Sequence, residues 1–204
     1  MTAAGELDRL RSMRWTAALV TPLRLALALA LLILAWLGMA LAFAAVLGVA
    51  LAAGAAEHRL SLWSDQSTRW RARLDGWASL ATYACIPLGA YWLRPELAHG
   101  EAVTFWAVTA AIAVPASFAF IKYGTVTGYR ARSALIASCA LGAAAVVLFA
   151  GGPIWPLQLT TAALVLAALE ETAMIAVLPH PLAEAQTLPA ALRIRRERFA
   201  DLQE

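Results

Sequence analysis

The sequence predicts an all-α integral membrane protein with six transmembrane helices and both termini in the cytoplasm. Of the 204 residues, 62% are hydrophobic and only 14% are charged, whereas soluble domains average about 45–50% apolar and about 25% charged residues. The apolar residues are concentrated in six runs, each close to the roughly 20 residues that a helix needs to cross a bilayer. Basic residues collect in every second connecting segment. This composition excludes a soluble domain, a disordered tail and a nucleic-acid-binding module.

Glycine and proline divide the apolar runs. The first two runs form one block that is too long for a single span, and Gly38 beside Met39 marks the expected turn. Arginines precede this block as in a secretion signal, but its length and the five further runs favour a retained helix. The Gly151-Gly152-Pro153 triplet separates the last two runs. We therefore expect a six-helix domain over residues 15–178, with spans at about 15–37, 38–56, 76–93, 102–121, 134–151 and 154–177.

The basic residues predict the orientation. Fifteen of the sixteen Lys and Arg residues lie at or before the start of the first span, in the two long loops or after the sixth span, and Arg94 lies on the other side. By the positive-inside rule both termini and both long loops are cytoplasmic, as in a multi-pass protein of the cytoplasmic (inner) membrane. Trp15, Trp36, Trp92 and Trp155 fall near span ends, where indole rings prefer the headgroup region.

The two ends of the chain are polar and basic. Residues 1–14 place Leu7, Leu10 and Met13 on one side of a helix, which indicates an amphipathic segment in the cytoplasmic interface. The alternative is a basic start that only sets the topology. The cytoplasmic basic tail, residues 179–204, has the same two interpretations.

The two cysteines indicate no metal or redox chemistry. Cys85 and Cys139 both lie in apolar runs, without the spacing of metal ligands. We expect two buried thiols in a helix bundle.

Chemistry is expected where ionisable side chains enter the apolar segments, because each costs about 2.5–3.5 kcal/mol at the centre of a span. The adjacent Glu170 and Glu171 point about 100° apart on a helix, so they cannot both address one partner. The alternative for each polar residue is a structural hydrogen bond between helices or a side chain that reaches the headgroups. The candidates, all toward the cytoplasmic face, are Arg24, Glu57, Asp75, Lys122, Glu170 and Glu171.

Four stretches of the sequence resemble segments of one family of six-helix membrane enzymes. The segment STRWRARLDGWASLATYACIPLGAYW, Ser67 to Trp92, resembles the centre of these enzymes, and Thr21-Pro22-Leu23-Arg24 resembles the T-x-x-R at the start of their first helix. IKYGTVTGYRAR, Ile121 to Arg132, is similar to the stretch before helix five, and Leu169-Glu170-Glu171 to the L-E-E of helix six. The family that these stretches resemble is the CDP-alcohol phosphatidyltransferases. The resemblance covers about residues 15–178 and implies a CDP-alcohol phosphatidyltransferase-like bundle.

The resemblance implies a phosphotransfer chemistry. The family motif D-x-x-D-G-x-x-A-R…G-x-x-x-D-x-x-x-D supplies four carboxylates that hold two divalent ions on the pyrophosphate of a CDP-linked lipid, and the last aspartate is the proposed base. For this chain the resemblance implies Mg²⁺ or Mn²⁺ as cofactor if the protein is active, and a homodimer. It further implies that Thr21, Arg24 and Lys122 bind the substrate and that Glu170 and Glu171 are supporting acids inside the membrane.

The chain departs from this motif. When Asp75 is placed on the third aspartate, Glu57 falls on the second, but Gly54 and Ser79 fall on the first and the fourth. Two divalent ions would bring a charge of about +4, and only two carboxylates would remain to bind them. The position of the proposed base is occupied by Ser79, which is not an acid, so no catalytic residue is assigned. One metal ion on Glu57 and Asp75 is one interpretation; the other, which we favour, is a site without metal in which these acids pair with Arg69, Arg71 or Arg73.

Two functions follow. The chain is either a divergent enzyme of phospholipid metabolism, which transfers a phosphatidyl-type group from a CDP-linked lipid to a hydroxyl acceptor, or a non-catalytic pseudoenzyme of the same fold. The pseudoenzyme would act as a lipid or nucleotide binder or as a partner subunit, without a cofactor. A small transporter is disfavoured because Glu170 and Glu171 do not extend into a polar path across the spans. Membrane lipid is the expected partner in either case.

Overall fold

The computed structural model describes residues 22–63, 69–124, 132–178, 187–189 and 192–193. Within these ranges the side chains of 56–63, 69–73, 75 and 132 are not described. Several predicted features lie outside the described residues: the N-terminal amphipathic segment, Trp15, Thr21 and most of the basic tail.

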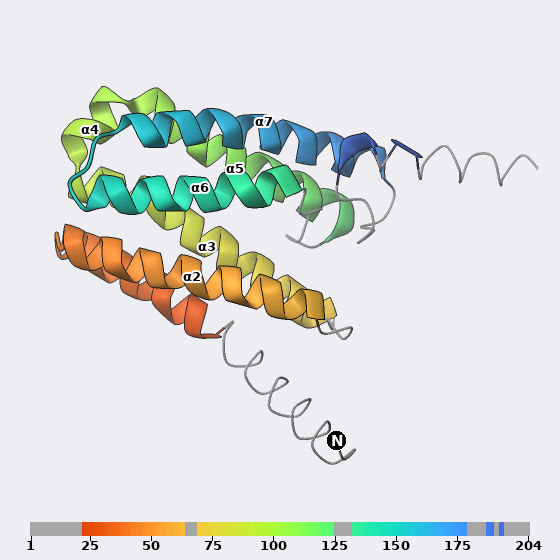
Figure 1. Ribbon diagram of the computed structural model, residues 1–204, viewed down its shortest axis with the longest axis horizontal. Coiled ribbons are helices and arrows are strands. Elements are labelled where there is room, and N and C mark those ends of the chain that lie inside the picture. Colours follow the sequence, from red (N-terminus) through yellow and green to blue (C-terminus); the bar gives the residue numbers. More distant parts are fainter. Residues whose placement is uncertain (1–21, 64–68, 125–131, 179–186, 190–191, 194–204) are drawn as a thin grey trace, which may run out of the picture.

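The described residues form helices and no strand, and the helices lie in a bundle (Figure 1). The first helix covers Pro22–Trp36 within the described range. The helices that follow are α2 (Ala40–Trp63), α3 (Arg69–Leu93), α4 (Pro95–Gly100), α5 (Ala102–Tyr123), α6 (Arg132–Phe149) and α7 (Trp155–Val177).

The helix boundaries agree with the predicted turns and differ in two places. Gly38 and Gly151 have φ angles of 75° and 99°, a backbone conformation that glycine adopts without strain, so both predicted turns are present. The segment before α5, expected as a loop, contains the short helix α4, which begins at Pro95. Proline suits a first helical position because its φ is preset and its missing N–H is not needed there. Helices α2 and α3 continue beyond the predicted apolar limits, residues 56 and 76.

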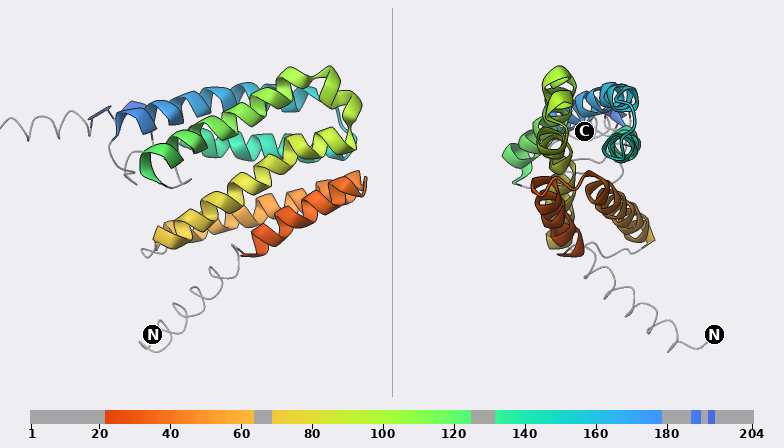
Figure 2. Two further views of the ribbon diagram at one scale, coloured as in Figure 1. Left: turned by 180° about the vertical axis from the view of Figure 1, so that it is seen from behind. Right: turned by 90° about the vertical axis from the view of Figure 1, so that its left-hand side faces the viewer.

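The bundle has two distinct ends (Figures 1 and 2). At one end, here called the turn end, lie the connections 37–39, 94–101 and 150–154. At the other, the loop end, the first helix, α3 and α6 begin and α2, α5 and α7 finish. Helix α7 packs on α5 and α6, α6 packs on α2, and α3 packs on α5. Residues far apart in the sequence therefore meet at the loop end.

The core of the bundle is built from small residues and a few large ones. Phe43 and Phe149 are buried and their rings meet edge to face with centroids 4.6 Å apart. Gly89 of α3 makes room for this pair, since a Cβ there would lie 2.6 Å from Cζ of Phe43. A smaller cluster of Ala119, Met174, Ile175 and Leu178 joins α5 to α7 at the loop end.

The outer surface of the bundle is apolar. Large side chains such as Val103 and Ile121 are more than four-fifths exposed, an arrangement that is unfavourable in water when it recurs over a whole surface. By length and composition, α5 and α7 are candidate membrane-spanning helices. The other apolar helices among the described residues are shorter: Pro22–Trp36, Ala40–Ala55 and Ser133–Phe149.

Candidate functional site

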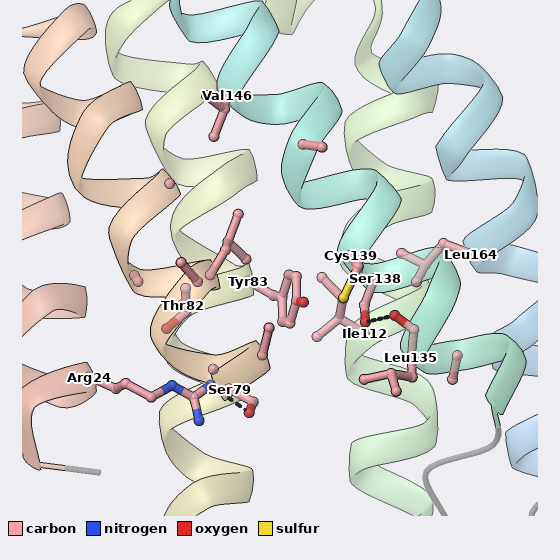
Figure 3. Close-up of a pocket in the computed structure, with 18 of the residues that line it drawn as sticks. Arg24, Ser79, Thr82, Tyr83, Ile112, Leu135, Ser138, Cys139, Val146 and Leu164 are labelled. Atoms are coloured by element: carbon pink, nitrogen blue, oxygen red, sulfur yellow. Dashed lines mark hydrogen bonds between the residues drawn. The ribbon is translucent and has the colours of Figure 1, made fainter. Parts of the chain in front are cut away.

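A cavity of about 570 Å³ opens between the helices (Figure 3). Its lining runs from Val146, one turn before the end of α6, to Arg24 and Ala134 near the loop end. The first helix, α2, α3, α5, α6 and α7 all contribute to its wall. Most of the lining is alanine, glycine, leucine and valine, which gives an apolar chamber. The polar or sulfur-containing side chains that line it are Arg24, Ser79, Thr82, Tyr83, Ser138, Cys139 and Glu171.

Arg24 is the buried cation of this cavity. It lies in the first helix, is 4% exposed, and its Nη2 donates a hydrogen bond of 2.9 Å to Oγ of Ser79 in α3. Figure 3 shows the guanidinium directed toward Ser79. A guanidinium stays charged at any depth, so its burial here depends on polar partners, of which Ser79 is one.

Gly54 gives the guanidinium its place against α2. A Cβ on Gly54 would lie 3.1 Å from Nη2 of Arg24 and 3.3 Å from its Cζ. These distances are tighter than ordinary van der Waals contact, so a Cβ at position 54 would require the guanidinium to shift by a few tenths of an ångström. Arg24 thus lies between Gly54 and Ser79, the two positions that the resemblance described above aligns with the first and fourth aspartates of the motif.

The remaining polar groups line the cavity beyond Arg24. Thr82 and Ser138 donate to carbonyls of their own helices, those of Ala78 at 2.8 Å and Leu135 at 3.0 Å. Figure 3 shows the ring of Tyr83 between the side chains of Thr82 and Ser138.

The two thiols differ. Cys85 is 2% exposed, and its thiol lies 3.2 Å from the carbonyl of Ala81 and 3.6 Å from that of Ala28. Cys139 is exposed and lines the cavity. The expectation of two buried thiols is therefore wrong for Cys139, because its position on α6 faces the chamber and not the core.

The two predicted metal ligands, Glu57 and Asp75, lie on α2 and α3. The structure describes the backbone at these positions but not the side chains. Glu57 follows Gly54 by one turn of α2, and Asp75 precedes Ser79 by one turn of α3. The predicted pairing of these acids with Arg69, Arg71 or Arg73 lies outside the described side chains.

Lys122 lies apart from Arg24. Its Nζ donates to the carbonyls of Ile175 and Ala176 at 2.6 and 3.0 Å, near the end of α7. The neighbouring hydroxyl of Tyr123 lies 2.7 Å from the carbonyl of Leu178 and 3.0 Å from that of Ile175. A cation at this position satisfies carbonyls left open by the helix end and complements its dipole. Lys122 does not line the cavity, so the structure gives it a capping role and does not bring it to the predicted substrate site.

The two adjacent glutamates have different surroundings. Glu170 accepts hydrogen bonds from the hydroxyl of Ser133, in the first turn of α6, and from the backbone N–H of Leu188 at 3.2 Å. Glu171 lines the cavity. The helical rotation of about 100° per residue accounts for this separation. Glu170 joins α6, α7 and the segment at Leu188, whereas Glu171 lines the same cavity as Arg24.

The described part of the site does not fit a pair of divalent ions. Among the residues whose side chains are described, no group of three or more His, Cys, Asp and Glu side chains is placed to hold a metal. Of the two positions beside Arg24, Gly54 offers no side-chain oxygen and Ser79 offers a neutral hydroxyl. A fixed guanidinium between them repels a divalent cation.

From the sequence, Gly54 and Ser79 were paired through the motif alignment, whereas Arg24 entered separately, and the three were not joined. Sequence reasoning also missed Thr82, Tyr83 and Ser138. The available signal was in α3, where polar residues recur at positions 79, 82 and 83, on one face of an otherwise apolar helix.

Comparison with known proteins assigns neither a family nor a function to this chain. No protein-family model, no curated protein and no solved structure matches this chain. The function is therefore inferred from the cavity and its residues.

Proposed function

We propose that this chain is a multi-pass membrane protein with a CDP-alcohol phosphatidyltransferase-like bundle that binds a phosphate-bearing lipid in the cavity at Arg24, without catalysing transfer. The observation that carries the proposal is the position of the Arg24 guanidinium, which fills the space between Gly54 and Ser79 at the wall of the cavity. The ligand class is a lipid with a phosphate or pyrophosphate headgroup.

The chemistry of the cavity supports a lipid of this class. A guanidinium binds phosphate oxygens in a planar, charge-assisted arrangement. The rest of the chamber is mainly apolar, which suits acyl chains. A soluble nucleotide or sugar phosphate would leave these apolar walls uncovered.

The position in the membrane follows from the same arrangement. Trp36, Trp92 and Trp155 are exposed and lie at or beside the turn end, where they suit a headgroup region. The basic segments of the sequence flank the loop end, which we place in the cytoplasm by the positive-inside rule. Arg24 then lies toward the cytoplasmic side of the bundle.

A binding assay tests the proposal. The purified protein in phosphatidylcholine nanodiscs is supplied with CDP-diacylglycerol, with phosphatidic acid or with neither, and bound lipid is measured by native mass spectrometry. We expect the wild-type protein to retain one or both phosphate-bearing lipids. Retention by Arg24→Gln should be at least about tenfold weaker, because the variant loses a charged hydrogen-bonding partner of the phosphate.

Arg94→Gln is the matched control, because it removes the same charge at the turn end. Comparing the retention of CDP-diacylglycerol with that of phosphatidic acid shows whether the cavity prefers a CDP-linked lipid or a simple anionic phospholipid. Equal retention of all lipids by the wild type and Arg24→Gln would refute the proposal.

Catalysis is the second candidate. It is favoured by Glu171, a carboxylate that lines the same cavity as Arg24, and by the positions of Glu57 and Asp75 one turn from Gly54 and Ser79 along α2 and α3. A divergent transferase, with Mg²⁺ or Mn²⁺ bound at Glu57 and Asp75, would release CMP from CDP-diacylglycerol when a hydroxyl acceptor is present. Release of CMP that Asp75→Ala abolishes would establish this candidate in place of the binding function.

A further inference from the structure

We infer that the site recognises the lipid phosphate directly through Arg24, without a divalent cation, and that Gly54 is the residue that makes this possible. This inference rests on the proposed binding function and deepens it. It concerns how the ligand's charge is neutralised, a task that the family motif gives to metal ions.

The first step is steric. The guanidinium of Arg24 lies within 3.1 Å of where a Cβ of Gly54 would stand. The absence of a side chain at position 54 lets the guanidinium lie close against α2. An aspartate at this position, as the motif has it, would occupy the space that the guanidinium now fills.

The second step is the orientation of the guanidinium. Ser79 accepts a hydrogen bond from Nη2 at 2.9 Å and holds the guanidinium from the side of α3. A guanidinium donates in a planar fork, so it can hold a serine hydroxyl and a phosphate oxygen together. With 4% of Arg24 exposed and the residue lining the cavity, the charge is fixed before any ligand arrives.

The third step is electrostatic. A phosphate needs a positive charge nearby in a medium of low dielectric constant, and either a metal ion held by carboxylates or a fixed arginine can supply it. Positions 54 and 79 supply no carboxylate, and Arg24 supplies the positive charge. Arg24 therefore replaces the metal ions at the point where two of their ligands are missing.

The test compares cation dependence in the wild-type protein. Retention of CDP-diacylglycerol and of phosphatidic acid in nanodiscs is measured with EDTA and with excess Mg²⁺. A second readout is alkylation of Cys139, which lines the cavity and is exposed, with the buried Cys85 as internal reference. We expect affinities in EDTA and in Mg²⁺ to agree within about twofold, and the lipid to protect Cys139 under both conditions.

The outcomes separate the two proposals. Binding that requires Mg²⁺ would overturn the inference and leave the binding function intact. Absence of binding with either lipid, in EDTA and in Mg²⁺, would remove the proposed function and this inference with it. The wild-type comparison needs no variant, so a failure of any variant to fold does not affect it.

Variants at two glycines of α2 test the steric step. Gly54→Ala pushes the guanidinium away and is expected to weaken lipid retention by about threefold or more. Gly48→Ala is the matched control, since it changes the same residue type on the same cavity wall, and its Cβ would meet only Val146 Cγ2 at 4.0 Å. Equal retention by the two variants would contradict a role for Gly54.

Restoring the motif tests the electrostatic step. In Gly54→Asp combined with Ser79→Asp, two carboxylates surround Arg24 and compete with the lipid phosphate for it. We expect lipid retention in EDTA to fall by about tenfold or more and to recover at least in part with Mg²⁺ or Mn²⁺. Retention in EDTA equal to that of the wild type would overturn the inference.

Discussion

The Nη2 atom of Arg24 donates a hydrogen bond to Oγ of Ser79 across 2.9 Å, although the two residues stand 55 positions apart in the chain. This bond joins the first helix to α3 beside Gly54 of α2. Three helices thus meet around one buried charge. We expect the stability of this end of the bundle to depend on it, and the proposed lipid binding relies on the same charge.

Replacing Ser79 by alanine should destabilise the protein. The substitution removes the hydroxyl that accepts from Arg24, so a buried guanidinium loses an acceptor, which costs about 1–3 kcal/mol of unfolding free energy. The measurement is unfolding in detergent by titration with SDS. Ser138→Ala is the control: Ser138 also lines the cavity, but its hydroxyl bonds to Leu135 of its own helix, and its loss should cost less than about 0.5 kcal/mol. Equal losses for the two variants would contradict the structural importance of the Arg24 bond.

Replacing Lys122 by methionine separates a capping role from a substrate-binding one. The variant keeps the length of the side chain but loses both bonds to the α7 carbonyls, so unfolding should become easier by about 1–3 kcal/mol. Because Lys122 does not line the cavity, lipid retention by the folded fraction should stay unchanged. A loss of retention without a loss of stability would support the role that the sequence resemblance implied.

Replacing Gly89 by alanine should be destabilising because it overpacks the core. The new Cβ would lie 2.6 Å from Cζ of Phe43, a fully buried ring that also contacts Phe149. The expected cost is about 1–3 kcal/mol, the usual range for overpacking. Gly48→Ala in α2 has an open neighbourhood and should be neutral or slightly stabilising, since alanine favours helix formation over glycine. Thermal unfolding of both variants in the same detergent makes the comparison.

Labelling of introduced cysteines tests the orientation in the membrane. In a background without Cys85 and Cys139, Glu96→Cys lies on α4 at the turn end and Leu192→Cys lies on the chain after α7. A membrane-impermeant maleimide added outside intact cells should label Glu96→Cys and should reach Leu192→Cys only after permeabilisation. The reverse pattern would place the cavity on the outer side of the membrane.

The helices could be predicted because their causes are local. Apolar runs of suitable length, interrupted at Gly38 and at Gly151 to Pro153, correspond to the helices observed, and both glycines adopt the positive φ that a turn requires. The sequence missed α4 because a helix of 6 residues has too little apolar periodicity to be recognised. Helices α2 and α3 extend beyond the predicted apolar spans because a helix continues into polar sequence once its first turns have formed.

The site could be predicted only in its components. The sequence analysis named Arg24 as a substrate-binding residue and Ser79 as a missing aspartate, but nothing in their spacing shows that one bonds to the other. Spacing did predict that Glu170 and Glu171 diverge, since that depends on one helix alone. Whether Lys122 meets a ligand or the end of α7 depends on how α5 and α7 are packed.

The sequence by itself determined that the chain is helical and apolar, where the helices turn, and which charges are unusual, because these properties belong to one segment at a time. Only the tertiary structure decided which of those charges meet, because side-chain contacts depend on the rotation and distance of neighbouring helices. A change of one residue in helical register turns a side chain by about 100°. The contact of Arg24 with Ser79 and Gly54, on which the proposed function rests, belongs to this second kind of information.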